Sequence, residues 1–155
     1  MKKFKTLKNP MDFAVKIMKE NNSIVDVPIG CVIVNNKNKL ISFANNESIS
    51  KKDPTAHAEL TAIRRACSVL NSNFLENCSL YVTLEPCKMC QAAIFESRIQ
   101  KVFFGAYNYK NTFEFQKKKY FFEKNNFQYY GGFSESECSK YLKSFFKKIR
   151  GEKLL

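Results

Sequence analysis

Two short polar motifs constrain this chain more than any other feature. The first is His57-Ala58-Glu59, which holds the only histidine, and the second is Pro86-Cys87-Lys88-Met89-Cys90. Zinc binds imidazole nitrogen and thiolate sulfur readily, and a structural zinc usually has four protein ligands. His57, Cys87 and Cys90 supply three ligands, and a fourth position left to water is typical of a catalytic zinc. The fold must therefore bring these two motifs together.

Both motifs follow turn signals and stand where helices are expected to begin. The N-terminus of a helix carries partial positive charge and unpaired N–H groups, which favour a thiolate over a thiol. Cys87 and Cys90 are three residues apart, so one helical turn can direct both sulfurs at one metal ion. Glu59 lies two residues after His57, on a different helix face, which favours a role beside the metal rather than as a ligand.

This arrangement predicts hydrolytic removal of an amine. Zinc in such a site lowers the pKa of water towards about 7. Glu59 is expected to act first as general base on the water and then as general acid towards a ring nitrogen and the leaving amine. The products would be a carbonyl and ammonia.

The Cys-x-x-Cys segment by itself is compatible with other kinds of site. Alone it could be a redox pair or half of a structural zinc site. Haem attachment would require histidine directly after Cys90, where the chain has Gln91. A four-cysteine ribbon would require a second closely spaced pair, which the sequence lacks. The combination of H-x-E with P-C-x-x-C is typical of the zinc deaminases that act on nucleobases.

The length of 155 residues predicts one domain spanning residues 1–155, and 45% hydrophobic residues indicate a globular chain. No apolar run is long enough for a membrane span, and no apolar region follows the basic N-terminus as in a secretory signal. Six cysteines could form disulfides, but several occupy core-like positions, which favours a reducing cytoplasmic compartment. They are Cys31, Cys67, Cys78, Cys87, Cys90 and Cys138.

The net charge of +12 indicates an anionic partner, with nucleic acid as the first candidate. Basic residues cluster at four places, although each cluster could equally be a solvated face, and the charge could reflect a generally Lys-rich composition. The clusters are at residues 51–52, 64–65, 117–119 and 147–150.

Periodicity and turn residues predict the elements. Strands alternating with helices in the middle of the chain imply a sheet covered by helices on both faces. Residues 107–126 are aromatic and basic at once and give no clear pattern. The expected helices span residues 10–21, 53–67, 87–97 and 134–149, and the expected strands span residues 31–34, 40–44, 80–84, 102–104 and 127–130.

Beyond the zinc motifs, nearly the whole chain from Pro10 to Arg150 resembles the bacterial tRNA-specific adenosine deaminases of the cytidine/deoxycytidylate deaminase superfamily. The resemblance covers both motifs with their flanks, residues 53–59 and 80–90. It also covers Val27-Pro28-Ile29-Gly30, Ser97-Arg98-Ile99, Gly105-Ala106 and Phe145-Phe146-Lys147.

The resemblance implies an α/β protein with a three-layer α/β/α cytidine deaminase-like fold and a central five-stranded mixed sheet. It implies conversion of wobble adenosine 34 to inosine in tRNA, with an arginine tRNA as the expected substrate. It further implies one Zn²⁺ per subunit, a homodimer, and a tRNA anticodon stem-loop that contacts both subunits.

Roles carry over by position. His57, Cys87 and Cys90 would bind zinc, and Glu59 would move protons. Asn46 would contact the flipped nucleotide, and the base pocket and anticodon loop would be contacted by Val27, Pro28, Ala58, Thr83, Phe145, Phe146, Lys147 and Arg150. The chain departs from the family at Asn108, where aspartate is common, and at residues 111–115, where a Gly-containing segment is usual. Both departures bear on how the nucleic acid is positioned.

Two alternative functions remain open at this point. The first is a deaminase of a free base or nucleoside, such as guanine or cytosine, which would share the fold and the zinc motifs. The second is a nucleic-acid-binding zinc protein without catalysis, for which Glu59 would have no use.

Overall fold

The computed structural model describes residues 4–109 and 128–151 of the chain. At its centre is a five-stranded mixed sheet in the order β2-β1-β3-β4-β5. The first two junctions of this order are antiparallel and the last two are parallel. The strands are β1 (Gly30–Asn35), β2 (Leu40–Asn45), β3 (Cys78–Leu84), β4 (Lys101–Ala106) and β5 (Gln128–Tyr130).

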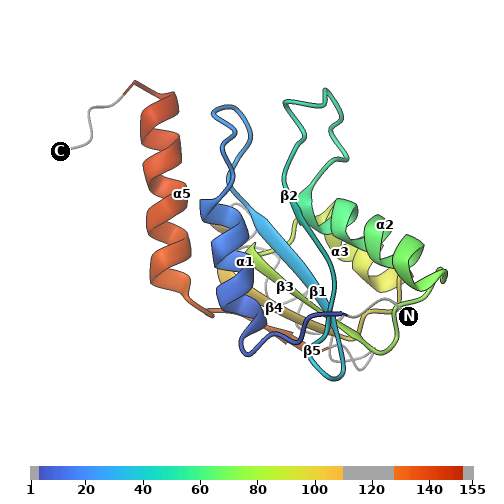
Figure 1. Cartoon of the computed structure of the whole chain (residues 1–155). Coiled ribbons are helices and arrows are strands. Elements are labelled where there is room, and N and C mark those ends of the chain that lie inside the picture. The colour runs from blue at the N-terminus through green and yellow to red at the C-terminus, as the bar shows by residue number, and fades with distance from the viewer. Residues whose placement is uncertain (1–3, 110–127, 152–155) are drawn as a thin grey trace.

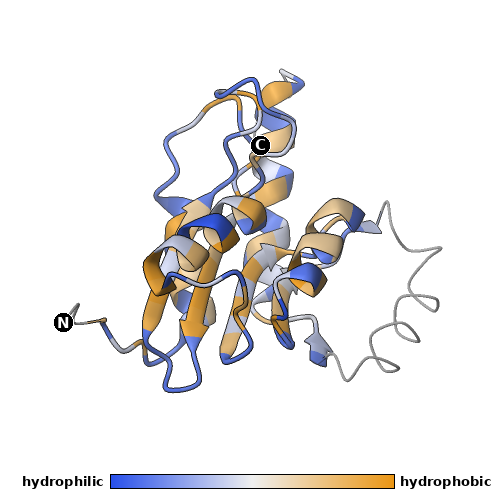
Figure 2. Ribbon diagram, turned by 90° about the vertical axis from the view of Figure 1, so that its right-hand side faces the viewer, coloured by the Kyte–Doolittle hydropathy of each residue, from blue (hydrophilic) through white to orange (hydrophobic). Residues whose placement is uncertain are grey.

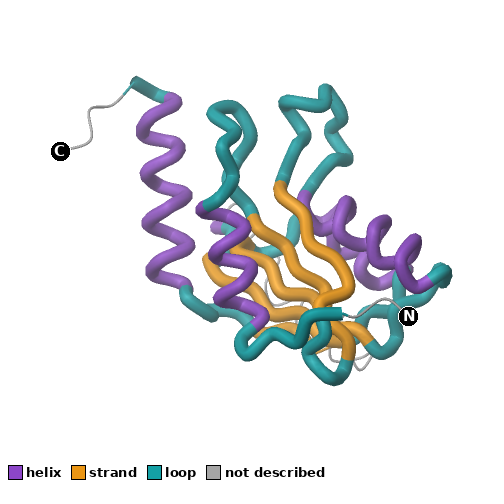
Figure 3. Tube along the Cα trace, in the orientation of Figure 1, coloured by secondary structure: helices purple, strands orange, loops and turns teal. Residues whose placement is uncertain are grey.

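Helices cover both faces of this sheet, so the fold is the three-layer α/β/α arrangement that the sequence predicted. Helices α1 (Pro10–Lys19) and α5 (Glu135–Ile149) lie on one face (Figure 1). Helices α2 (Ala58–Leu70) and α3 (Lys88–Glu96) lie on the other, and Figure 3 shows the sheet between the two pairs.

Two hydrophobic cores result from the two covered faces. Alternate residues of a strand point to opposite faces. Ile33 accordingly packs with Ala62 of α2, whereas its neighbour Val32 packs with Met18 of α1. Figure 2 shows the strands as predominantly apolar segments between loops that are mostly polar.

Local side-chain bonds explain several element boundaries. The Asn9 side chain caps α1 by accepting hydrogen bonds from the N–H groups of Met11 and Asp12, at 3.0 and 3.3 Å. A Cβ atom on Gly30 would lie 2.1 Å from the Ala14 carbonyl oxygen. Only glycine therefore lets α1 pack this closely over the start of β1.

The predicted start of the second helix was wrong by five residues. Instead of beginning a helix, Asp53 accepts hydrogen bonds from the N–H and the hydroxyl of Thr55, at 2.8 and 2.7 Å. Asp side chains compete with the helix backbone in this way. Helix α2 begins at Ala58, with His57 as its N-cap residue.

The remaining predicted elements are present within a few residues of their expected ends. Phe127, the predicted first residue of β5, and residues 111–115 lie outside the described residues. In α5, Cys138 and Leu142 are buried, whereas Phe146 is 42% exposed. Cys31 and Cys78 are also buried, and Cys67 is partly exposed.

Two contacts between helices fix α5 beside α1. Glu137 forms an ion pair with Lys19, and the Tyr141 hydroxyl donates a hydrogen bond of 3.3 Å to the Lys19 carbonyl oxygen. Across the parts of the chain that the structure describes, no helix has both the length and the apolar character needed to cross a bilayer.

Candidate active site

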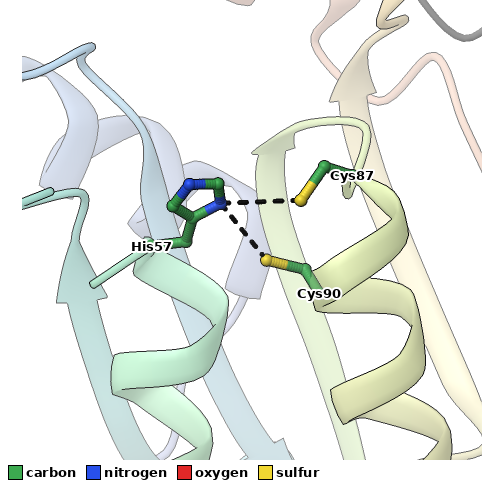
Figure 4. Close-up of side chains that lie close together, drawn as sticks. All are labelled: His57, Cys87 and Cys90. Carbon is green, nitrogen blue, oxygen red and sulfur yellow. Dashed lines mark hydrogen bonds between the residues drawn. The ribbon is translucent and has the colours of Figure 1, made fainter. Parts of the chain in front are cut away.

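The two motifs converge at the N-termini of α2 and α3. His57 is the N-cap of α2, Cys87 is the N-cap of α3, and Cys90 lies in the first turn of α3. The Nδ1 atom of His57 lies 3.6 Å from the Cys87 sulfur and 3.5 Å from the Cys90 sulfur (Figure 4). The sequence predicted this convergence.

These distances fit a zinc ion. A tetrahedral zinc at about 2.3 Å from sulfur and about 2.0 Å from nitrogen places those two atoms about 3.5 Å apart. All three candidate ligand atoms lie within 4.8 Å of one another, so one ion can reach them together. One nitrogen and two sulfurs form a donor set that zinc prefers.

The two thiols also have the electrostatics of a metal site. The pKa of Cys87 falls to about 5, chiefly because it accepts a hydrogen bond from the Cys90 thiol. The pKa of Cys90 is raised, first by that hydrogen bond and then by burial. Without metal the pair therefore retains one proton near neutral pH, and metal binding releases it because zinc binds the thiolate form.

Glu59 lies beside the three ligands, and one oxygen of its carboxyl group is left without a partner among the described residues. It is only 4% exposed, and burial raises the pKa of its carboxyl to about 7. Its Oε2 atom has no hydrogen-bond partner within the described part of the chain. A buried, unpaired carboxylate oxygen next to a metal site is available to a water molecule or a substrate.

A cavity of about 520 Å³ opens beside His57. Its walls come from the segment before β1, the β2–α2 loop, the ends of β3 and β4, the residues after β4, and helix α5. The lining residues are Val27, Ile29, Asn46, Ser48, His57, Leu84, Ala106, Tyr107, Asn108, Tyr109, Ser139, Leu142, Lys143 and Phe146.

Three predicted substrate-binding residues line this cavity, namely Val27, Asn46 and Phe146. The Asn46 side chain is 5% exposed and donates a hydrogen bond of 3.4 Å to the Val27 carbonyl oxygen. Its own Oδ1 has no partner among residues 4–109 and 128–151. An oxygen left unsatisfied at a cavity wall can accept a hydrogen bond from a ligand.

The other predicted contacts lie elsewhere. Pro28 and Phe145 line a neighbouring cavity of about 430 Å³ between the α1–β1 loop and α5. Lys147 lines a groove of about 670 Å³ along α5, and Arg150 is exposed at the end of that helix. Ala58 and Thr83 are fully buried, and the Thr83 hydroxyl accepts a hydrogen bond of 3.1 Å from the Gly30 N–H.

Glu85, which fixes the residues after β4 at the cavity wall, was not predicted from the sequence. Glu85 is 5% exposed and accepts a hydrogen bond of 3.0 Å from the Asn108 N–H. Its own N–H donates to the Ala106 carbonyl oxygen at 2.8 Å. The one available signal was the position of Glu85 directly before Pro86 in the cysteine motif.

Comparisons with known proteins agree with this fold and site. The cytidine and deoxycytidylate deaminase zinc-binding region matches residues 5–106. A tRNA-specific adenosine deaminase of Buchnera aphidicola subsp. Baizongia pistaciae is 44% identical over 144 residues, covering 90% of this chain and 88% of the relative.

Two solved structures are also similar. One comes from a study of A-to-I editing by tRNA:A34 deaminases at the wobble position, with 34% identity, a TM-score of 0.75, and coverage of 85% of this chain and 97% of that one. The other is a guanine deaminase from Bacillus subtilis, with 38% identity, a TM-score of 0.62, and coverage of 68% of both chains.

The fold, the zinc-ligand triad and the buried glutamate therefore place this chain in the zinc-binding cytidine and deoxycytidylate deaminase family. Because its similarity to the Buchnera protein extends over nine tenths of the chain, it belongs more narrowly to the family of tRNA-specific adenosine deaminases.

Proposed function

We propose that this chain is a zinc-dependent hydrolase that converts adenosine to inosine at position 34 of a tRNA anticodon, with an arginine tRNA as the expected substrate. The observation that carries the proposal is the buried Glu59 carboxyl, with one oxygen unpaired among the described residues, beside three zinc ligands of which His57 lines a cavity. The sequence similarity to tRNA-specific adenosine deaminases supports the choice of substrate.

The chain's own residues have distinct roles in this reaction. His57, Cys87 and Cys90 would hold zinc, which when bound supplies positive charge that lowers the pKa of water. Glu59 takes a proton from the attacking water and returns protons to N1 of the adenine and to the amine. A C6–O bond forms, the C6–N bond breaks, and the products are inosine and ammonia.

The base must leave its stack to reach this cavity. A nucleotide in an anticodon loop is already unpaired, so extruding it costs less than it would in a duplex. We propose that the amide of Asn46 binds the extruded nucleotide and that Val27 packs against the base. Both residues line the cavity beside His57.

A basic groove continues from this cavity and supports an RNA substrate. Lys140, Lys143 and Lys147 line the groove, and Lys143 also lines the cavity beside His57. Lys side chains that track a phosphate backbone supply affinity without sequence readout. A free base would gain nothing from this groove.

The decisive experiment is a single-turnover assay with zinc-loaded protein on an arginine tRNA anticodon stem-loop that carries A34. We expect inosine at position 34 and none in a matched stem-loop whose adenosine lies in the paired stem. If no inosine forms while free guanine, cytosine or adenosine is deaminated, the proposal is wrong.

A second candidate is a free-base or nucleoside deaminase, and the similarity to a guanine deaminase favours considering it. The two candidates differ in their response to salt. Contacts to phosphates make RNA binding strongly salt-dependent, whereas binding of a neutral base depends little on salt. Activity on a free base that is insensitive to salt would support the second candidate.

Lys147 provides a direct test of the RNA groove. We expect Lys147→Ala to weaken stem-loop binding about three- to tenfold at low salt and to reduce the slope of log K against log salt by about 0.7. Fluorescence anisotropy at several salt concentrations measures both quantities. Lys37→Ala, in the β1–β2 turn, is the matched control. An equal loss in that control would remove the argument for the groove.

We further infer that residues 1–155 form one deaminase domain that acts in the cytoplasm as a homodimer. The family resemblance supports the dimer, and Leu70, Phe74 and Phe95 expose apolar side chains near the ends of α2 and α3. Light scattering of the purified protein tests it, with twice the chain mass as the expected result.

A further inference from the structure

Two loops at the rim of the cavity are joined through one buried carboxylate. Asp26 lies in the α1–β1 loop, and its Oδ1 accepts hydrogen bonds from the N–H groups of Ile49 and Ser50, at 2.7 and 3.2 Å. Ile49 and Ser50 belong to the β2–α2 loop, which leads to His57. Asp26 therefore links segments more than twenty residues apart.

The remaining bonds of Asp26 organise its own loop. Its Oδ2 accepts a hydrogen bond of 3.0 Å from the Ser23 hydroxyl, and that hydroxyl oxygen in turn accepts one of 2.9 Å from the Asp26 N–H. Hydrogen bonds to an ionised acceptor are roughly twice as strong as those between neutral groups. The linkage is thus stronger than an ordinary contact between loops.

Burial does not neutralise this carboxylate. Asp26 is 1% exposed, whereas Ile24 and Ile49 are 85% and 61% exposed. Burial alone would raise the pKa of Asp26, but the hydrogen bonds from Ser50, Ile49 and Ser23 outweigh it and hold the pKa below its ordinary value. An acid placed inside a loop whose apolar residues face outward indicates a specific structural role.

The two loops that Asp26 joins carry residues of the cavity wall. Val27 directly follows Asp26, and Asn46 begins the second loop. The Asn46 amide donates to the Val27 carbonyl oxygen, and the Asn46 N–H donates to the Ile29 carbonyl oxygen at 3.3 Å. All three residues line the cavity beside His57. The Asp26 bonds are shorter than these and lie just behind the cavity wall.

We propose that Asp26 is a positioning residue for the deamination, which fixes both rim loops so that Val27 and Asn46 present a rigid wall to the extruded base. The inference rests on the proposed function. Two tasks would then belong to different parts of the chain. RNA affinity would come from phosphate contacts on α5, and orientation of the base would depend on the two linked loops. A misplacement of about 1 Å at such a wall can cost about a hundredfold in rate.

The test compares Asp26→Ala and Asp26→Asn with wild type. Asp12→Asn, which removes one acidic charge at an exposed position, is the control. Single-turnover rate on the A34 stem-loop, zinc content and melting temperature are measured for each variant. Stem-loop affinity is measured for the same changes in a Glu59→Ala background, where no turnover complicates binding. Asparagine retains an oxygen for the Ile49 and Ser50 N–H groups but loses the charge.

We expect Asp26→Ala to lower the rate at saturating RNA at least tenfold and Asp26→Asn about threefold. Stem-loop affinity should stay within about twofold and zinc at one equivalent, and Asp12→Asn should behave like wild type. If the alanine variant does not fold, the asparagine variant decides the question. A rate within twofold of wild type in the folded variants overturns the proposal, as does a parallel loss of rate, affinity and zinc.

The outcome also distinguishes this inference from the proposed function. If wild-type protein fails to form inosine at A34, the proposed function fails first. If wild type is active and the folded Asp26 variants match it, only the positioning role of Asp26 fails.

Discussion

We expect Glu59→Ala to retain one zinc ion per chain and to lose deamination by a factor of about 10²–10⁴, the range typical of a general acid–base residue. The ligands His57, Cys87 and Cys90 are untouched by the change, so the metal should stay. Metal analysis and single-turnover inosine formation on the same preparation measure the two effects together.

Two further variants make this prediction specific. Glu59→Gln keeps the shape of the side chain but cannot move a proton between the water and the leaving amine, so it should be as inactive as the alanine variant. Glu96→Ala, at the exposed end of α3, should be as active as wild type. Loss of zinc from the Glu59 variants would make Glu59 a ligand, and unchanged turnover would favour a protein that binds nucleic acid without catalysis.

The buried position of Glu59 has a measurable effect on stability. A carboxylate oxygen that is buried without a partner costs free energy, and functional sites commonly contain such costs. Metal-free Glu59→Gln should therefore unfold at the same temperature as metal-free wild type or higher. This result would separate a catalytic role from a structural one, since loss of a structural residue lowers the unfolding temperature.

The second large effect is expected at Cys87. Cys87→Ala should bind less than about a tenth of an equivalent of zinc and form no detectable inosine, because two remaining ligands hold zinc far less tightly than three. It should also lose the stabilisation that zinc gives the folded state, about 4 kcal/mol when free zinc exceeds its dissociation constant a thousandfold. Metal analysis and thermal unfolding with and without a chelator measure these changes.

Cys67→Ala is the matched control for that experiment. Cys67 is a partly exposed free thiol on α2 and is outside the candidate metal site. Its variant should retain zinc, activity and the chelator-dependent shift in unfolding temperature. Full zinc occupancy in Cys87→Ala would contradict the ligand assignment.

The metal site could be predicted from sequence because its geometry is local to two helix starts. Cys87 and Cys90 are brought together by one turn of α3, and Pro86 before them indicated where that helix begins. The start of α2 was misplaced because the Asp53 side chain bonds Thr55 instead of opening a helix. Periodicity does not reveal such competition between side chain and backbone.

The cavity walls could not be predicted in the same way. Phe145 and Phe146 are adjacent in sequence, but they line two different cavities on either side of α5. Asp26 was missed because hydropathy places an acid in solvent and isoleucine in the core, whereas here Asp26 is buried and Ile24 is exposed. Both outcomes depend on contacts between segments far apart in the chain.

Residues 27–29 lie between two neighbouring cavities, because alternate residues of this stretch line different cavities. Val27 and Ile29 line the cavity beside His57, and Pro28 lines the neighbouring cavity, which Tyr141 also lines. Gly30 packs closely against α1 and fixes the position of the residue that follows this stretch. A shift of one residue in this stretch would change the side chains that line both cavities at once. An insertion between Asp26 and Gly30 should therefore abolish activity, because it would change which side chains line the cavity beside His57, so this stretch sets the register of the pocket wall.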